Sequence, residues 1–266
     1  MSNFKYPSIA SSLIIFLILI LFTLILGAPF AILPEYVDWF DKNVANAIAY
    51  VLPMLATIYV VYKRIKKTSD VKKVFSFKIG GFNKYLIIIP LTLVMMLWVD
   101  FFASLIPMPD WIAEIFKEAF NLSIPNIIMI AILAPLLEEI LVRGLVLRGY
   151  LLNYSPIKSI IASAVFFGAI HLNPWQFVGG FISGLFLGYL YYKTKSLVPT
   201  ILVHFLNNSI SVVFSFFYEE ADASFVDMLG DKTYYIILIS SLGVGYILIK
   251  ELDKVLNANK ELNTIM

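Results

Sequence analysis

Ala134-Pro-Leu-Leu-Glu138-Glu139-Ile-Leu-Val-Arg143-Gly144 lies inside an apolar stretch that runs from Pro125 to Leu151. The stretch is long enough for a membrane helix, which needs about 20 residues. Ionisable side chains are costly in hydrocarbon, and where they occur they usually mark a functional site. The two glutamates and the arginine therefore predict a polar site inside the membrane.

The composition of the whole chain agrees with this reading. The 266 residues are 60% hydrophobic and 14% charged, with a mean hydropathy of +0.86. A soluble domain carries about 25% charged residues. So much apolar surface cannot be buried in one core, so we expect an all-α, polytopic integral membrane bundle. The chain has no cysteine, which excludes disulfides, thiolate nucleophiles and cysteine-based metal sites.

Hydropathy predicts about eight membrane spans. The first is longer than the apolar region of a signal peptide, which has about 7–15 residues, so we expect it to be retained. The spans are expected near Ser8–Leu33, Val44–Tyr62, Tyr85–Ile106, Pro125–Leu151, Ile157–Leu172, Trp175–Tyr192, Leu197–Phe217 and Tyr234–Ile249.

The connections between these spans alternate in charge. The loop Lys63–Lys84 is rich in lysine and arginine and has Asp70 as its one acidic residue. The positive-inside rule then predicts a multi-pass protein of the cell membrane with both termini in the cytoplasm. We expect the basic loop to set orientation and not to bind nucleic acid. Acidic residues gather at 35–41, 110–118 and 219–231, and basic residues return at Arg148, Lys158, Lys193, Lys195, Lys250, Lys254 and Lys260.

Two further features lie outside the polar spans. The segment Asp110–Asn121 mixes acidic residues with large apolar ones, which predicts an amphipathic helix on the outer interface. Its apolar members are Trp111, Ile112, Ile115, Phe116 and Phe120. Asp100, near the outer end of the third span, receives no role from the sequence.

The two glutamates are expected to differ in role. Glu139 and Arg143 are four residues apart and share a helix face, so they can form an ion pair. Glu138 lies about 140° around the helix from Arg143 and is left free. An ion pair that only fixes helix packing would explain Glu139 and Arg143, but it leaves Glu138 without a reason.

The only two histidines also lie in predicted spans. Phe167 and His171 are four residues apart, as are His204 and Asn208, so each pair projects from one helix face. A lone histidine near the end of a span is more often structural than catalytic, and Asn207 fits a role in interhelical hydrogen bonding. A carboxylate, two imidazoles and an amide together supply the parts of a hydrolytic site.

The sixth span carries glycines at four-residue spacing. Gly180, Gly184 and Gly188 form a ridge of small residues that permits close helix contact. We interpret this ridge as a packing surface.

These motifs resemble the CPBP family, which is named for CAAX proteases and bacteriocin-processing enzymes and is also called Abi. EExxxR is present as Glu138–Arg143, FxxxH as Phe167–His171 and HxxxN as His204–Asn208. The resemblance covers roughly Pro125–Phe217. It implies an intramembrane glutamate protease without cofactor or metal, acting on a peptide or protein substrate among membrane lipids.

By the same resemblance, Glu138 is the general base on a water molecule and His171 helps to hold it. His204 and Asn208 stabilise the oxyanion, while Glu139, Arg143 and Phe167 support the geometry. The chain then divides into an N-terminal membrane region (1–124), a catalytic core (125–217), and a C-terminal span and tail (218–266).

Three alternatives stay open. Glu138 and the two histidines could hold zinc with an open position for water, although HExxH is absent. A non-catalytic scaffold or immunity protein could use the same fold to bind a partner, and a transporter could carry a proton relay. Prenylated CAAX proteins, leader peptides, peptide pheromones and bacteriocins all remain candidate substrates, and the sequence indicates no oligomeric state.

Overall fold

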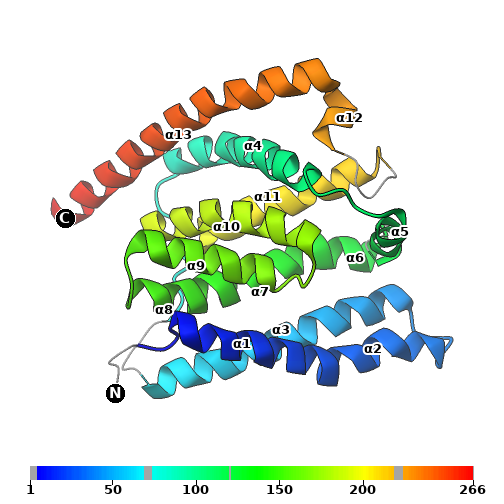
Figure 1. Ribbon diagram of the computed structural model, residues 1–266. Helices are drawn as coiled ribbons and strands as arrows, with labels where there is room; N and C mark the ends of the chain where they lie inside the picture. Colours follow the sequence, from blue (N-terminus) through cyan, green and yellow to red (C-terminus); the bar gives the residue numbers. More distant parts are fainter. Residues whose placement is uncertain (1–4, 69–73, 120, 219–223, 266) are drawn as a thin grey trace.

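The computed structural model describes residues 5–68, 74–119, 121–218 and 224–265 (Figure 1). Every regular element in this part of the chain is helical, which confirms the predicted all-α class. The elements are α1 (Ile9–Phe22), η1 (Thr23–Gly27), α2 (Ala28–Ile32), η2 (Leu33–Glu35), α3 (Lys42–Thr68), α4 (Asn83–Ser104), α5 (Asp110–Ala119), α6 (Ile124–Ile128), η3 (Met129–Leu133), α7 (Ala134–Glu139), η4 (Ile140–Leu147), α8 (Arg148–Leu151), α9 (Pro156–Ala169), α10 (Pro174–Thr194), α11 (Leu197–Ser215), α12 (Phe225–Leu229) and α13 (Asp231–Ile265).

All eight predicted segments are helical. In the described part of the chain, five helical runs are long and apolar enough to cross a membrane, which confirms a polytopic helical membrane protein. They are Ile9–Glu35, Lys42–Thr68, Asn83–Ser104, Leu197–Ser215 and Asp231–Asn257. The number of eight crossings stays a prediction.

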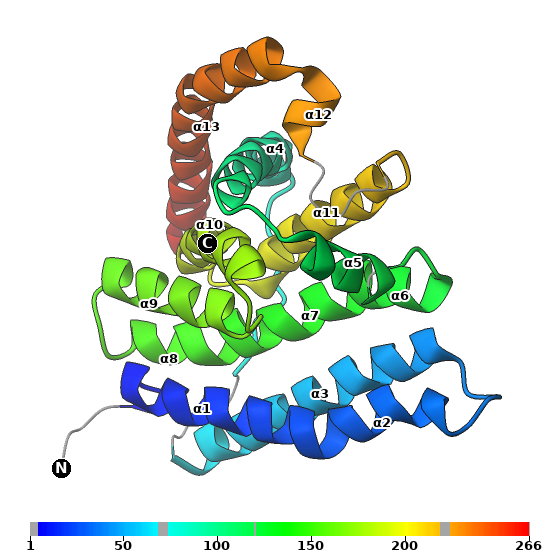
Figure 2. The same ribbon diagram turned by 45° about the vertical axis from the view of Figure 1, so that its right-hand side comes forward.

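The helices form three layers. In Figures 1 and 2, α1 to α3 make one layer, α6 to α11 the middle layer, and α4 with α12 and α13 the third. Helix α4 packs on α10 and α13, whereas α3 packs on α1 and α7. Of the first three predicted spans, the first two therefore lie on one face of the middle layer and the third lies on the other face. The predicted division of the chain into three regions stays a proposal.

Successive long helices run in opposite directions, so their connections alternate between two ends of the bundle (Figure 1). One end holds the end of α3, the turns from α8 to α9 and from α10 to α11, and the end of α13; we call it the basic end. The opposite end holds α5, α12 and the turn from α9 to α10; we call it the acidic end. Which end faces the cytoplasm stays a prediction. Some residues of the predicted charge pattern lie outside the described part of the chain. They are Asp70, Lys72, Lys73, Glu219, Glu220 and Asp222.

Two helices extend further than hydropathy predicts. Helix α3 continues to Thr68 and α13 to Ile265. A span predicted from hydropathy ends where the first run of charged residues begins. Lysine, glutamate and leucine are nevertheless good helix formers, so the helix itself continues.

The fourth predicted span is helical throughout but not a regular α-helix. In η3 the N–H of Ala134 bonds to the carbonyl of Met129, five residues back. In this register the carbonyl of Ile130 would next meet Pro135, which has no N–H. Such π-helical turns are frequent at functional sites, and this one leaves the Ile130 carbonyl in need of another donor.

The glycine ridge of α10 faces α9, as expected. A Cβ on Gly180 would lie 3.2 Å from the Cα of Gly168, and one on Gly184 would lie 3.0 Å from the Cα of Ala164. The predicted packing role is confirmed, because an added Cβ at either position would press on the backbone of α9 more closely than an ordinary van der Waals contact.

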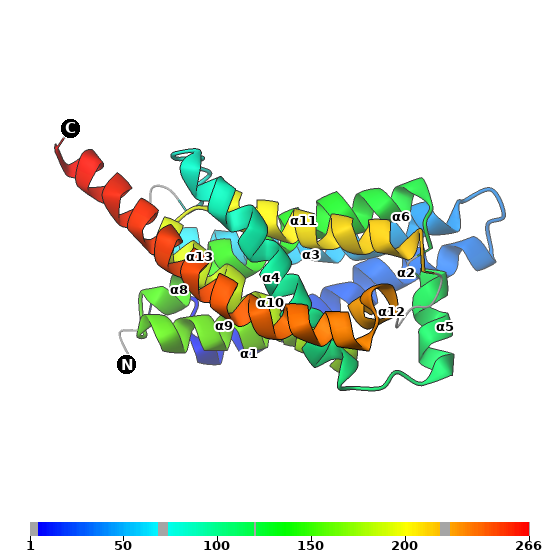
Figure 3. The same cartoon turned by 90° about the horizontal axis from the view of Figure 1, so that it is seen from above.

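The predicted amphipathic helix is present as α5, which lies across the ends of the other helices at the acidic end (Figure 3). Trp111 and Ile115 are 64% and 56% exposed. Phe116 instead turns inward and meets the ring of Trp175 at 6.5 Å between centroids. Phe120 lies outside the described residues. Contact of α5 with the membrane surface stays a prediction.

Candidate active site

Glu139 and Arg143 form the expected ion pair on one helix face. Nη1 of Arg143 donates to Oε1 of Glu139 at 2.7 Å, and both side chains are fully buried. Nη2 of Arg143 donates to the carbonyl of Gly184 at 3.3 Å. The guanidinium also stacks over the ring of Phe167, 4.4 Å from its centroid. The pair therefore joins the fourth predicted span to α9 and α10.

Glu138 makes no such pair with Arg143. It is 6% exposed, and its Oε1 accepts a hydrogen bond from the hydroxyl of Tyr50 in α3. Sequence reasoning missed Tyr50. Asn46 and Tyr50 are four residues apart in an apolar span, and this polar face is the signal that could have found it.

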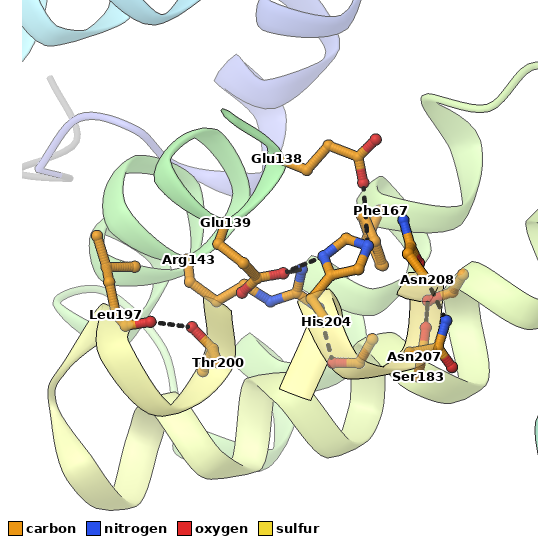
Figure 4. Close-up of polar contacts among 12 residues, drawn as sticks. Glu138, Glu139, Arg143, Phe167, Ser183, Leu197, Thr200, His204, Asn207 and Asn208 are labelled. Carbon is orange, nitrogen blue, oxygen red and sulfur yellow. Dashed lines mark hydrogen bonds and ion pairs between the residues drawn. The ribbon is translucent and has the colours of Figure 1, made fainter. Parts of the chain in front are cut away.

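His204 lies between the two glutamates (Figure 4). Its Nδ1 is 3.1 Å from Oε1 of Glu139 and its Nε2 is 3.6 Å from Oε2 of Glu138. An ionised carboxylate only accepts hydrogen bonds, so Nδ1 carries the proton toward Glu139. The 3.6 Å gap is too long for a direct hydrogen bond, which leaves Nε2 available to a bound group.

Phe167 is the point at which the three motifs meet. Its ring centroid lies 5.3 Å from that of His171 and 5.5 Å from that of His204. Nδ1 of His171 donates to the carbonyl of Phe167 at 2.9 Å. Nε2 is therefore the ring nitrogen that can bind another group. Among the described residues no hydrogen bond or ion pair joins His171 to Glu138, although both line the same cavity.

Asn208 is held at both ends of its amide. Its Nδ2 donates to the carbonyl of Ile130 at 2.9 Å, and its Oδ1 accepts from Nδ2 of Asn207 at 3.1 Å. Asn208 therefore supplies the donor that Pro135 denies to Ile130. The second hydrogen on its Nδ2 has no partner among the described residues. Asn207 has an intrahelical role, since it fixes the amide of Asn208.

The four predicted catalytic residues surround one cavity of about 940 Å³. Glu138, His171, His204 and Asn208 all line it together with Tyr50, whereas Glu139 and Arg143 lie behind its wall. The close-up in Figure 4 shows Glu138, His204 and Asn208 together with Glu139, Arg143 and Asn207.

Asp100, unassigned from the sequence, also lines this cavity. Its two carboxylate oxygens accept hydrogen bonds from the N–H of Phe225 at 3.0 Å and from the hydroxyl of Tyr234 at 2.8 Å. It therefore ties α4 to α12 and α13. In the described part of the chain, no group of three or more His, Asp or Glu side chains is arranged to hold a metal ion.

Residues 120–210 match the family model described as type II CAAX prenyl endopeptidase Rce1-like. The expected family resemblance is confirmed. The Rce1-like region contains all three motifs and supports a CAAX-type intramembrane protease as the general class of this protein. Tyr50 and Asp100 lie outside the Rce1-like region. No curated protein and no solved structure matches this chain.

Proposed function

We propose that the protein is an intramembrane endopeptidase in which Glu138 activates a water molecule for attack on a peptide bond. One observation carries this proposal. The buried carboxylate of Glu138 is not neutralised by Arg143 and faces a cavity that it shares with both histidines. A buried charge of this kind, next to space for water, is suited to act as a general base.

Glu138 carries one proton from the water molecule to the leaving amide nitrogen. It takes a proton from the water as the water oxygen attacks the carbonyl carbon of the substrate. It then delivers that proton to the amide nitrogen as the carbon–nitrogen bond breaks. His171 holds the water through Nε2, because its Nδ1–H is committed to the carbonyl of Phe167.

The developing oxyanion is stabilised by His204 and Asn208. Nδ1–H of His204 is directed at Glu139, so donation from Nε2 requires the doubly protonated ring. Asn208 donates the hydrogen that Ile130 does not use. Each oxyanion donor contributes about 3–4 kcal/mol to transition-state stabilisation in known hydrolases.

The substrate is a peptide or protein reached within the membrane. Prenylated CAAX proteins, leader peptides, pheromones and bacteriocins are the classes that the resemblance leaves open. No cofactor or metal has a role in the proposed reaction. We also propose that both termini lie in the cytoplasm, because the charges of the connections alternate along the chain.

Comparative mass spectrometry tests the function. Peptides from a deletion strain complemented with the wild-type chain are compared with those from strains carrying Glu138→Gln or the control Glu251→Gln. Glu251 is exposed and pairs with Lys254. We expect products that appear with the wild type and the control and are absent with Glu138→Gln, at equal protein levels. Identical peptides in all three strains would favour the scaffold alternative.

A further inference from the structure

The half of the bundle between Glu138 and the basic end is packed with apolar side chains in the described part of the chain. The chain runs from Glu138 toward that end through η4 and α8 (Figure 1). Leu141, Val142, Leu145 and Leu147 along this path are fully buried. Leu187 and Leu190 of α10 and Leu197 of α11 are buried beside them. A packed apolar layer of this kind excludes water and substrate.

The half between Glu138 and the acidic end is hollow. The cavity extends from Glu138 to Pro107 and Met108 after α4, to Phe116 of α5, and to Leu172 and Trp175 at the turn from α9 to α10. Figure 3 shows α5 at that end of the bundle. Water and peptide therefore have a path to Glu138 from the acidic end.

The charge of this path is negative. Asp100 and Glu138 are the acidic residues that line the cavity, and its lining in the described part of the chain contains no lysine or arginine. Helix α5 adds Asp110, Glu114 and Glu118 against Lys117 at the same end, and Lys42 of α3 pairs with Glu118 at 4.0 Å. A cleft lined by one sign of charge concentrates ligands of the opposite sign.

We infer that Glu138 is reached from the outer face of the membrane, and that the substrate is a peptide presented on that face, neutral or cationic around the scissile bond. This inference rests on the proposed function and on the charge pattern, which puts the acidic connections outside. A substrate with a free carboxylate next to the scissile bond would find no lysine or arginine in the cavity lining of the described residues. A prenylated CAAX protein on the cytoplasmic face is therefore a poor fit.

Cysteine accessibility tests this inference without any substrate, because the natural chain contains no cysteine. Ser183→Cys and Ala103→Cys report on two positions of the cavity lining. Tyr36→Cys marks the acidic end, where Tyr36 is 79% exposed. Lys254→Cys marks the basic end, where the Lys254 side chain is 71% exposed. Each variant is treated with a membrane-impermeant cationic thiosulfonate and with an anionic one of similar size, in intact cells and in inside-out vesicles.

In intact cells we expect both cavity cysteines and Tyr36→Cys to react and Lys254→Cys to be spared, with the reverse in inside-out vesicles. At the cavity positions the cationic reagent should react at least about tenfold faster than the anionic one, relative to the same ratio at Tyr36→Cys. The inference is overturned if the cavity cysteines react together with Lys254→Cys, react from neither side, or show no preference for the cationic reagent. It is also overturned if Tyr36→Cys reacts only in inside-out vesicles. Labelling does not depend on turnover, so these outcomes are separate from failure of the proposed function.

Discussion

The hydroxyl of Tyr50 donates a hydrogen bond to Oε1 of Glu138, although the two residues lie in helices of different layers. Tyr50 comes from α3, outside the Rce1-like region of residues 120–210. The bond fixes one carboxylate oxygen and leaves Oε2 turned toward His204. The N-terminal layer therefore takes part in orienting the proposed base.

Tyr50→Phe tests this contact, since it removes the hydroxyl and keeps the ring. A hydrogen bond to a charged group is worth about 1.5–3 kcal/mol, so kcat should fall roughly 10- to 100-fold with little change in KM. Tyr59→Phe is the matched control, as Tyr59 lies on the same helix and is 60% exposed. An unchanged kcat in Tyr50→Phe would show that the bond does not act on the base.

Glu139→Gln should reduce both stability and activity, since it leaves Arg143 as an unpaired charge in the core. Removing one partner of a buried pair costs about 3–5 kcal/mol. The double variant Glu139→Gln/Arg143→Met removes the unpaired guanidinium as well, so it should unfold at a higher temperature in detergent than Glu139→Gln alone. Glu251→Gln breaks an exposed pair and should change stability by about 0–1 kcal/mol. Wild-type stability of Glu139→Gln would contradict the ion-pair assignment.

Asn208→Ala should lower turnover by roughly 10²–10³, the loss typical of one oxyanion donor. It also deprives the Ile130 carbonyl of its donor, which costs stability. Pro135→Ala restores a backbone N–H next to that carbonyl and separates the two effects. We expect Asn208→Ala/Pro135→Ala to regain stability in thermal unfolding but not turnover. Recovery of turnover in the double variant would show that Asn208 has a structural role and is not an oxyanion donor.

Gly184→Ala should destabilise the contact between α9 and α10. The added Cβ would lie 3.0 Å from the Cα of Ala164, and overpacking of this kind costs about 1–3 kcal/mol. Gly243→Ala is the control, because a Cβ there meets nothing within 4 Å; higher helix propensity should leave its stability equal or up to about 1 kcal/mol greater. Melting temperatures in detergent measure both. A Gly184→Ala variant as stable as Gly243→Ala would contradict the tight packing.

Contacts within one helix were predictable from the sequence. The four-residue spacing of Glu139 and Arg143 predicted their ion pair, and the spacing of the glycines predicted the packing ridge. Both follow from the fixed geometry of the helix. The same geometry predicted that Arg143 leaves Glu138 free.

Contacts between distant helices were not predictable. Tyr50 and Glu138 are 88 residues apart, and only the packing of α3 on α7 brings them together. The position of His204 between two glutamates likewise depends on how α11 packs on α7. The role of Asn208 at Ile130 depends on a π-helical turn followed by Pro135, and a hydropathy pattern does not reveal such a turn.

The metal dependence of the purified enzyme tests the central claim most directly. The substrate is a peptide identified by the comparison of strains, and cleavage is measured after exhaustive treatment with strong zinc chelators, with the metal content determined in the same sample. With Glu138 as base and with His204 and Asn208 as oxyanion donors, cleavage should continue at its full rate in protein that contains less than stoichiometric metal. Stoichiometric zinc whose removal stops cleavage, and whose return restores it, would contradict the account even though every motif residue remained essential.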